Sequence, residues 1–81
     1  MDEKILDRVR NMISNLMQVP LEDVLVSSSP GTIKAWDSLQ HLNLILSLEE
    51  TFGLQFAPEE TTELLSVETI VLMVEEKLTA K

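Results

Sequence analysis

Residues 37–53 have the sequence DSLQHLNLILSLEETFG, and this stretch carries helix signals at both of its ends. Asp37 is a favourable N-cap residue, and Gln40 stands three positions later, where a capping box places its second side chain. Gly53 suits the left-handed position that ends many helices. The leucines and isoleucines between them supply a broad apolar face. We therefore expect a helix that begins at Asp37 and ends at Gly53.

Two more long helices and one short helix are expected around this one. Residues 2–17 place apolar side chains at helical spacing, and the pattern stops just before Pro20. Pro58 opens a short helix that we expect to end near Leu65. Ser66 is a suitable cap for the last helix. The apolar face of that helix consists of Val67, Ile70, Val71, Val74 and Leu78.

The connection over residues 18–36 has no sustained period and contains the run Ser27-Ser28-Ser29-Pro30-Gly31. So long a connection is unusual in a compact domain. We expect it to be ordered, because four apolar side chains can hold it against the core: Leu21, Val24, Leu25 and Ile33. Since no strand pattern is present, the sequence predicts an all-α fold. This fold is a small four-helix bundle of three long helices and one short helix, with a long first loop and a single domain over residues 1–81.

The chain is strongly acidic, with 14 Asp and Glu against six Lys and Arg, and its formal charge is −8. Phosphate binding depends on Lys and Arg, so nucleic acid and membrane surfaces are not expected partners. Residues 37–81 hold nine of the acids and two of the bases, which indicates partners with basic docking patches. The lack of cysteine excludes disulfides and thiol nucleophiles, and no apolar run approaches the roughly 18 residues of a membrane span. We expect a cytoplasmic monomer.

Enzymatic catalysis by the chain itself has little support. His41 follows Ser38 by three residues on the same helix, but a serine nucleophile also needs an oriented base and an oxyanion pocket. A metal site of His41 with Glu49 or Glu50 is equally weak, because one helical turn does not bring these side chains together. Ser38 is a candidate for a role other than catalysis. The free N–H groups of a helix N-terminus favour an anion such as a phosphodiester there, although a serine in this place is ordinarily only a cap.

The segment from Trp36-Asp37-Ser38-Leu39 through the following helix to Leu54 closely resembles the acyl carrier protein family. That family has an Asp-Ser-Leu motif, an apolar helix and a Leu-Glu-Glu-x-Phe ending, which here spans Leu48 to Phe52. The long preceding loop and the Phe56-Ala57-Pro58-Glu59 entry into a short helix also match. The resemblance extends from about Ile5 to Leu78 and therefore covers nearly the whole chain.

The resemblance implies a carrier rather than an enzyme. In the family the motif serine, here Ser38, is esterified by a 4′-phosphopantetheine arm that a phosphopantetheinyl transferase takes from coenzyme A. The terminal thiol of the arm holds the acyl group as a thioester and presents it to acyl-loading, acyl-transfer or synthase enzymes. Asp37 is expected to cap the helix and to lie near the transferase's metal and phosphate site. A chain without cysteine has to acquire its thiol in this way.

Further residue roles follow from the resemblance. Leu39 is similar to the family's hydrophobic contact with partner enzymes, although it could also be a core residue. Trp36, His41, Glu49 and Glu50 are additional candidates for partner recognition, and Trp36 could equally anchor the long loop to the core. Acyl-chain cavity candidates, for which plain core packing is the alternative, are Leu42, Leu46, Phe52, Ile70 and Val74.

The sequence also departs from the pattern of fatty-acid carriers. Gln40 and Asn43 stand where those proteins usually have acids, and Thr51 follows the two glutamates. The helix is therefore less acidic than that of a general fatty-acid carrier. Trp36 and His41 are instead similar to residues of dedicated, stand-alone carriers that serve one modifying or secondary-metabolic pathway, such as a polyketide-type pathway. We therefore favour a specialised carrier over a general carrier of fatty-acid biosynthesis. An aminoacyl or peptidyl carrier domain is a second hypothesis, although the chain lacks the Gly-Gly-x-Ser motif of such domains. An unmodified acidic helical adaptor that binds basic proteins is a third.

Overall fold

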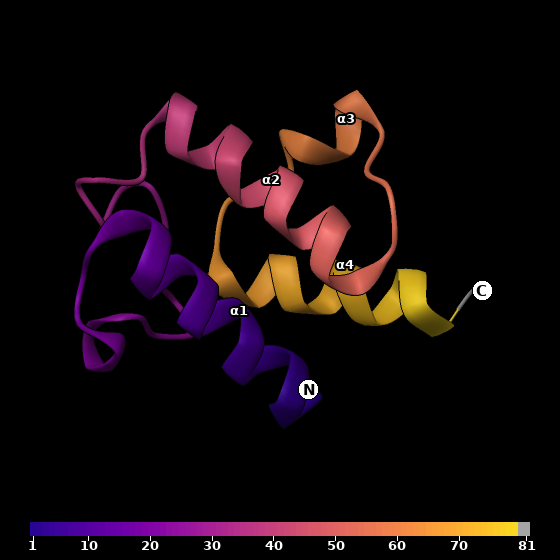
Figure 1. Cartoon of the computed structure of the whole chain (residues 1–81), viewed down its shortest axis with the longest axis horizontal. Coiled ribbons are helices and arrows are strands. Elements are labelled where there is room, and N and C mark those ends of the chain that lie inside the picture. The colour runs from indigo at the N-terminus through magenta and orange to yellow at the C-terminus, as the bar shows by residue number, and fades with distance from the viewer. Residues whose placement is uncertain (80–81) are drawn as a thin grey trace.

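The computed structural model describes residues 1–79, and over these residues it contains helices and loops but no strand. Three long helices surround the core, and one short helix lies beside α2 (Figure 1). The helix α1 packs against both α2 and α4. The elements are α1 (Glu3–Met17), a 3-10 turn η1 (Leu21–Asp23), α2 (Ser38–Phe52), α3 (Pro58–Thr61) and α4 (Val67–Thr79). The expected all-α fold with a long first loop is confirmed.

The core lies where the three long helices meet. The valine and isoleucine side chains of α1 and α4 interlock there with leucines of α2, and burial of each such side chain stabilises the fold by about 1.5–3 kcal/mol. Four of the five apolar residues expected on the last helix are buried, and Leu78 packs at the edge. The side chains with no exposed area include Val9, Ile13, Leu44, Leu48, Leu64, Val67, Ile70, Val71 and Val74.

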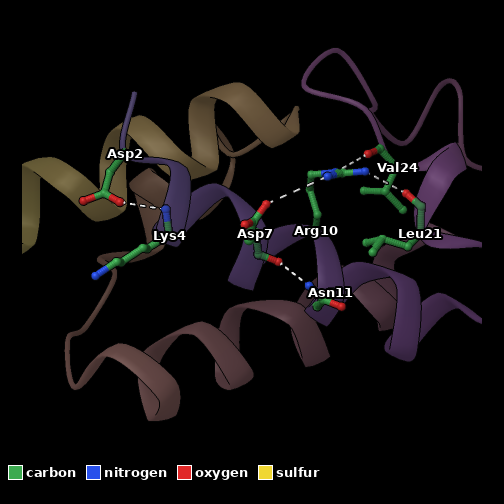
Figure 2. A network of polar contacts seen from close by, with 7 residues as sticks. All are labelled: Asp2, Lys4, Asp7, Arg10, Asn11, Leu21 and Val24. Carbon is green, nitrogen blue, oxygen red and sulfur yellow. Dashed lines mark hydrogen bonds and ion pairs between the residues drawn. The ribbon is translucent and has the colours of Figure 1, made fainter.

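The first helix ends at Met17, as the sequence predicts, but Gln18 ends it and not Pro20. Asp2 caps its beginning by accepting hydrogen bonds from the backbone N–H groups of Lys4 (2.9 Å, Figure 2) and Ile5 (3.2 Å). At the other end Gln18 adopts a left-handed conformation with φ of 55°, and its N–H bonds to Ser14 O. This conformation turns the chain out of the helix before Pro20 is reached.

Arg10 holds the long loop against α1. Its Nε–H donates to Val24 O at 2.7 Å and its Nη2 donates to Leu21 O at 3.0 Å, so one guanidinium satisfies two carbonyl groups of the loop (Figure 2). The turn η1 that these carbonyls flank is absent from the sequence-based expectation. Farther on, Val26 O and Ser28 O accept the first two N–H groups of α4. Of the four apolar residues expected to hold the loop, Val24 and Ile33 are buried, whereas Leu21 and Leu25 are exposed, contrary to expectation. Hydrogen bonds therefore order the loop together with two buried side chains.

The short helix α3 ends at Thr61, four residues earlier than expected. The hydroxyl groups of Thr61 and Thr62 bond back to Pro58 O (2.7 Å) and Glu59 O (2.8 Å), which competes with continued helical hydrogen bonding. The chain then turns to bury Leu64 in the core. Ser66 caps α4 as expected, because its hydroxyl accepts the N–H of Thr69 at 3.2 Å.

Candidate functional site

Ser38 is the first residue of α2, and its side chain is exposed. The carboxylate of Asp37 accepts the N–H of Gln40 at 2.9 Å and thereby caps the helix, as expected. Because Asp37 has an extended backbone conformation, the chain bends sharply from the loop into the helix at this point. The serine hydroxyl is thus presented at a fixed place, at the positive end of a helix dipole.

A surface hollow of about 350 Å³ lies next to Ser38. It is formed by the end of the long loop, the first turn of α2 and the segment between α3 and α4. Its lining residues are Pro30, Trp36, Asp37, Ser38, His41 and Leu65. Sequence reasoning did not select Pro30 and Leu65, because each is far from the serine motif along the chain and neither has a local signal of function.

Trp36 and His41 connect three segments around this hollow. The indole N–H of Trp36 donates to Nδ1 of His41 at 2.9 Å, and Nε2 of His41 lies 2.9 Å from Thr61 O. A carbonyl oxygen can only accept, so Nε2 carries the hydrogen and Nδ1 is the acceptor for the indole. The histidine is therefore a neutral tautomer in this arrangement, and it joins the loop, α2 and α3 to one another.

This geometry bears on two of the candidate recognition residues. Trp36 is only 2% exposed, so it anchors the loop to the core instead of facing a partner. His41 is half-buried and uses both ring nitrogens inside the domain, so it does not stand free as a base for Ser38. Its ring borders the hollow, and its contact with a partner stays a prediction. Local sequence could not show the bond to Thr61, because this residue is twenty positions away along the chain.

Three other polar side chains on α2 also form hydrogen bonds within the domain. Gln40 donates through Nε2 to Leu16 O at 3.2 Å, which satisfies a carbonyl at the C-terminal end of α1. Asn43 donates in turn to Oε1 of Gln40 at 3.2 Å. Gln40 therefore bonds to α1 and does not complete the expected capping box. Glu49 accepts the backbone N–H of Phe56 at 2.9 Å, so this candidate recognition residue supports the chain after α2. Glu50 is exposed.

The leucines of α2 do not all lie where the sequence suggested. Leu39 is 67% exposed, so it is not a core residue. Leu42 and Leu46 are each 54% exposed and do not line the interior, contrary to expectation. The reason is the register of α2, which buries Leu44, Ile45 and Leu48. Residues two positions from a buried residue lie about 200° around the helix and therefore face outward.

The remaining three cavity candidates are inside or at the edge of the core. Ile70 and Val74 are fully buried, and Phe52 is half-buried. None of the three lines the hollow beside Ser38.

The short helix α3 is held to its neighbours mainly by polar contacts. Glu60 accepts the N–H of Ala57 at 2.7 Å and pairs with Lys77 of α4 at 2.9 Å. These two contacts lower the pKa of Glu60 from its ordinary value of 4.5. The Lys77 ammonium also lies 5.4 Å from the centre of the Phe56 ring. No side chain of α3 itself is buried.

Comparison with known proteins identifies the family of the chain. No family model matches the chain. Among curated proteins, the chain is 32% identical over 78 residues to the acyl carrier protein of Rubrobacter xylanophilus, and the match covers 96% of each chain. It is 30% identical over 77 residues to the acyl carrier protein of Thermosynechococcus vestitus, with 95% of each chain covered. The acyl carrier protein of Coprothermobacter proteolyticus is 29% identical over 79 residues.

These matches run through the whole helical bundle and include the segment around Ser38. The chain belongs to the acyl carrier protein family. Within residues 1–79, none of the helices has both the length and the apolar character required to cross a membrane.

Proposed function

We propose that this protein is an acyl carrier whose Ser38 receives a 4′-phosphopantetheine arm from coenzyme A through a phosphopantetheinyl transferase. The observation that carries the proposal is the exposed Ser38 at the first position of a capped helix, in a chain that belongs to the acyl carrier protein family. The arm supplies a terminal thiol that holds an acyl group as a thioester. Acyl-loading, acyl-transfer or synthase enzymes are then the partners that act on this cargo.

The residues around Ser38 fit such an arm. The phosphodiester carries a negative charge, and the N-terminus of α2 stabilises an anion by about 0.3–1 kcal/mol when it is exposed. The adjacent hollow of about 350 Å³ provides a partly apolar surface along which the arm can lie. Asp37 already uses its carboxylate to cap α2, and this keeps the serine in place. We assign to Asp37 the additional role of approaching the transferase's metal and phosphate site.

The loading reaction needs a base that this chain does not place beside Ser38. The serine oxygen forms the new bond to phosphorus, the pyrophosphate bond of coenzyme A breaks, and the nucleotide part leaves with the bonding electrons. The hydroxyl proton passes to the transferase, because both ring nitrogens of His41 are already engaged. The Nε2–H of His41 donates to Thr61 O, and Nδ1 accepts the indole N–H of Trp36. The chain thus contributes the nucleophile and its position, and its role is that of a carrier.

The surface charge supports enzyme partners with basic patches. The formal charge of −8 attracts such partners over a distance and raises their association rate. A specialised stand-alone carrier fits the α2 surface, since Gln40 and Asn43 form a hydrogen-bond chain to α1 where a general fatty-acid carrier would present acids. We propose that it acts as a cytoplasmic monomer.

The experiment that tests this proposal is intact-mass analysis after incubation with coenzyme A and a broad-specificity phosphopantetheinyl transferase. We expect the wild-type protein to gain the mass of one arm and Ser38→Ala to gain none. Ser27→Ala is the matched control, because Ser27 is also an exposed serine but lies within the long loop. It should be loaded like the wild type. A wild-type protein that gains no mass would support the unmodified adaptor instead.

A further inference from the structure

The imidazole of His41 holds two walls of the hollow beside Ser38 together. Its Nδ1 accepts the indole N–H of Trp36 at 2.9 Å, and its Nε2–H donates to Thr61 O at 2.9 Å. The imidazole also stacks on the indole, with 6.1 Å between the ring centroids and 29° between the ring planes. Trp36 is 2% exposed, so little water reaches its ring. We call Trp36, His41 and Thr61 the His41 latch.

The His41 latch requires a neutral imidazole. A neutral ring has one donor and one acceptor nitrogen, whereas an imidazolium has two donors. If His41 were protonated, its Nδ1–H would point at the indole N–H, and two donor nitrogens 2.9 Å apart repel each other. The bond from Nε2–H to Thr61 O would remain and would become charge-assisted. A proton therefore acts on the two sides of the His41 latch in opposite ways.

The ionisable groups in the segments around His41 are mostly carboxylates. Asp37 lines the hollow together with the ring, and its carboxylate already accepts the N–H of Gln40. Glu60 of α3 pairs with Lys77 of α4. The others are exposed, and they are Lys34 of the long loop, Glu59 of α3 and Glu63 in the segment after α3. An imidazolium would thus have carboxylates around it, but its Nδ1–H would still meet the indole.

We propose that His41 is a proton-operated latch on the wall of the hollow beside Ser38. The neutral ring fastens the end of the long loop to α2 and α3. The protonated ring releases Trp36 and the end of the loop, while α3 stays attached through Thr61. Histidine ordinarily changes its charge between about pH 5 and pH 8, so a modest acidification is sufficient to operate such a latch. The His41 latch belongs to the unmodified chain, so it does not depend on the proposed arm.

Release of Trp36 would change the surface next to the serine. Trp36 and His41 both line the hollow of about 350 Å³, and Pro30 belongs to the same loop as the indole. Leu65 lines the hollow from the segment that follows α3. Protonation would therefore separate the loop side of the hollow from its α3 side. The shape of the hollow beside Ser38 would then depend on pH.

The test is an NMR titration of the unmodified protein from about pH 8 to pH 5, followed at the indole proton of Trp36 and the ring protons of His41. The chain has one tryptophan and one histidine, so these signals do not overlap with others of their kind. We expect the indole proton to move upfield with the same midpoint as the His41 ring, because its hydrogen bond is lost. Acrylamide should quench the indole more strongly at the acidic end. Amide exchange around α3, corrected for the intrinsic effect of pH, should not accelerate.

His41→Asn is the matched variant. Its amide oxygen takes the place of Nδ1 as an acceptor for the indole, but the amide has no charge to gain over this range. The indole signal of this variant should therefore be independent of pH. The wild-type titration decides the proposal by itself if the variant does not fold.

Four outcomes would overturn the proposal. The first is an indole proton that stays in place while the His41 ring titrates. The second is a His41 ring that does not titrate down to about pH 5. The third is an indole shift that occurs equally in His41→Asn, because another group such as Asp37 would then be its cause. The fourth is faster exchange around α3 with the same midpoint, because the whole joint would then come apart instead of its Trp36 side.

Discussion

The indole N–H of Trp36 donates to Nδ1 of His41, and the opposite nitrogen of the same ring donates to Thr61 O. One imidazole thus fastens the end of the long loop and the short helix α3 to the first turn of α2. Trp36 is the only tryptophan of the chain, so its indole resonance reports on this bond without interference. The hollow beside Ser38 is bordered by both rings.

Replacing this histidine should loosen α3. In His41→Phe the buried indole N–H and Thr61 O both lose their partner, and we expect the free energy of unfolding to fall by about 2 kcal/mol. The indole proton resonance of Trp36 should shift, and the amides around α3 should exchange faster with solvent, because no side chain of α3 itself is buried. NMR spectra and hydrogen exchange measure both effects. An unshifted indole resonance would contradict the hydrogen bond.

Arg10 is expected to contribute strongly to the stability of the long loop. Arg10→Met keeps most of the apolar stem but removes the side-chain donor of Val24 O and one of the two donors of Leu21 O, which retains the backbone N–H of Val24. The loss should lower the free energy of unfolding by about 1–3 kcal/mol. Arg8→Met is the control, because Arg8 is exposed on the same helix. Arg8→Met should change the free energy of unfolding by no more than about 0.5 kcal/mol. Urea denaturation compares the two variants, and equal effects would show that the loop contacts of Arg10 are not stabilising.

At the two left-handed helix ends, removing a glycine should lower the stability and introducing one should raise it. Gln18 and Gly53 have φ angles of 55° and 64°. Gly53→Ala should lower the free energy of unfolding by about 1 kcal/mol, since a side chain is strained in this conformation. Gln18→Gly relieves the same strain and should raise the free energy of unfolding by about 0.5 kcal/mol. This gain remains although the bond from the Gln18 side chain to Asn15 O is lost. Thermal and urea unfolding measure both changes, and a loss of stability in Gln18→Gly would refute this account.

The stability of the protein should depend on the ionisation of Glu60. The Ala57 N–H and Lys77 lower the pKa of this carboxyl in the folded state. Its contribution to stability is therefore complete above the unfolded value near 4.5 and is lost as the pH falls through the folded pKa. The difference between wild type and Glu60→Gln in urea midpoint should shrink correspondingly on acidification. Lys77→Met should reduce the pH-dependent part without removing it, since the Ala57 bond remains. A difference that is constant with pH would contradict the shift.

Salt should affect the association rate and the dissociation rate of a partner enzyme differently. We expect charges to steer the proposed encounter of this acidic chain with a transferase, and such charges are screened beyond about 8 Å at physiological ionic strength. We expect the association rate to fall as salt is raised, while the dissociation rate changes little if the exposed leucines of α2 form the contact: Leu39, Leu42 and Leu46. Stopped-flow measurements without coenzyme A separate these rates. A dissociation rate that rises as steeply as the association rate falls would indicate ion pairs at the contact.

The bounds of α2 were predictable from sequence because its two ends carry local signals. Asp37 caps the beginning through the adjacent N–H groups, and Gly53 takes the left-handed conformation at the end. The side of α2 that faces the core was not predictable, because leucines occur on several sides of the helix. Packing against α1 selects Leu44 and Leu48 for the core and leaves Leu46 outside, and this choice depends on residues far away in the chain.

The site was predictable only in part for the same reason. Exposure of Ser38 follows from its place at a capped helix start. The bonds from Trp36 through His41 to Thr61 could not be inferred, since they depend on how the loop and α3 are brought together in space. The early end of α3 had a weak signal in the pair Thr61 and Thr62, whose hydroxyl groups compete for helix carbonyls.

The backbone N–H of Asp2 donates to the carboxylate of Glu75, so the start of α1 lies against the last turns of α4. The beginning of α2, whose first residue is Ser38, lies at the other end of the molecule (Figure 1). A bead, a fluorophore or a fused enzyme joined near either of these segments would therefore stay away from the arm that we propose at Ser38. The domain could then be attached through its N-terminal segment without obstructing the proposed transfer of cargo.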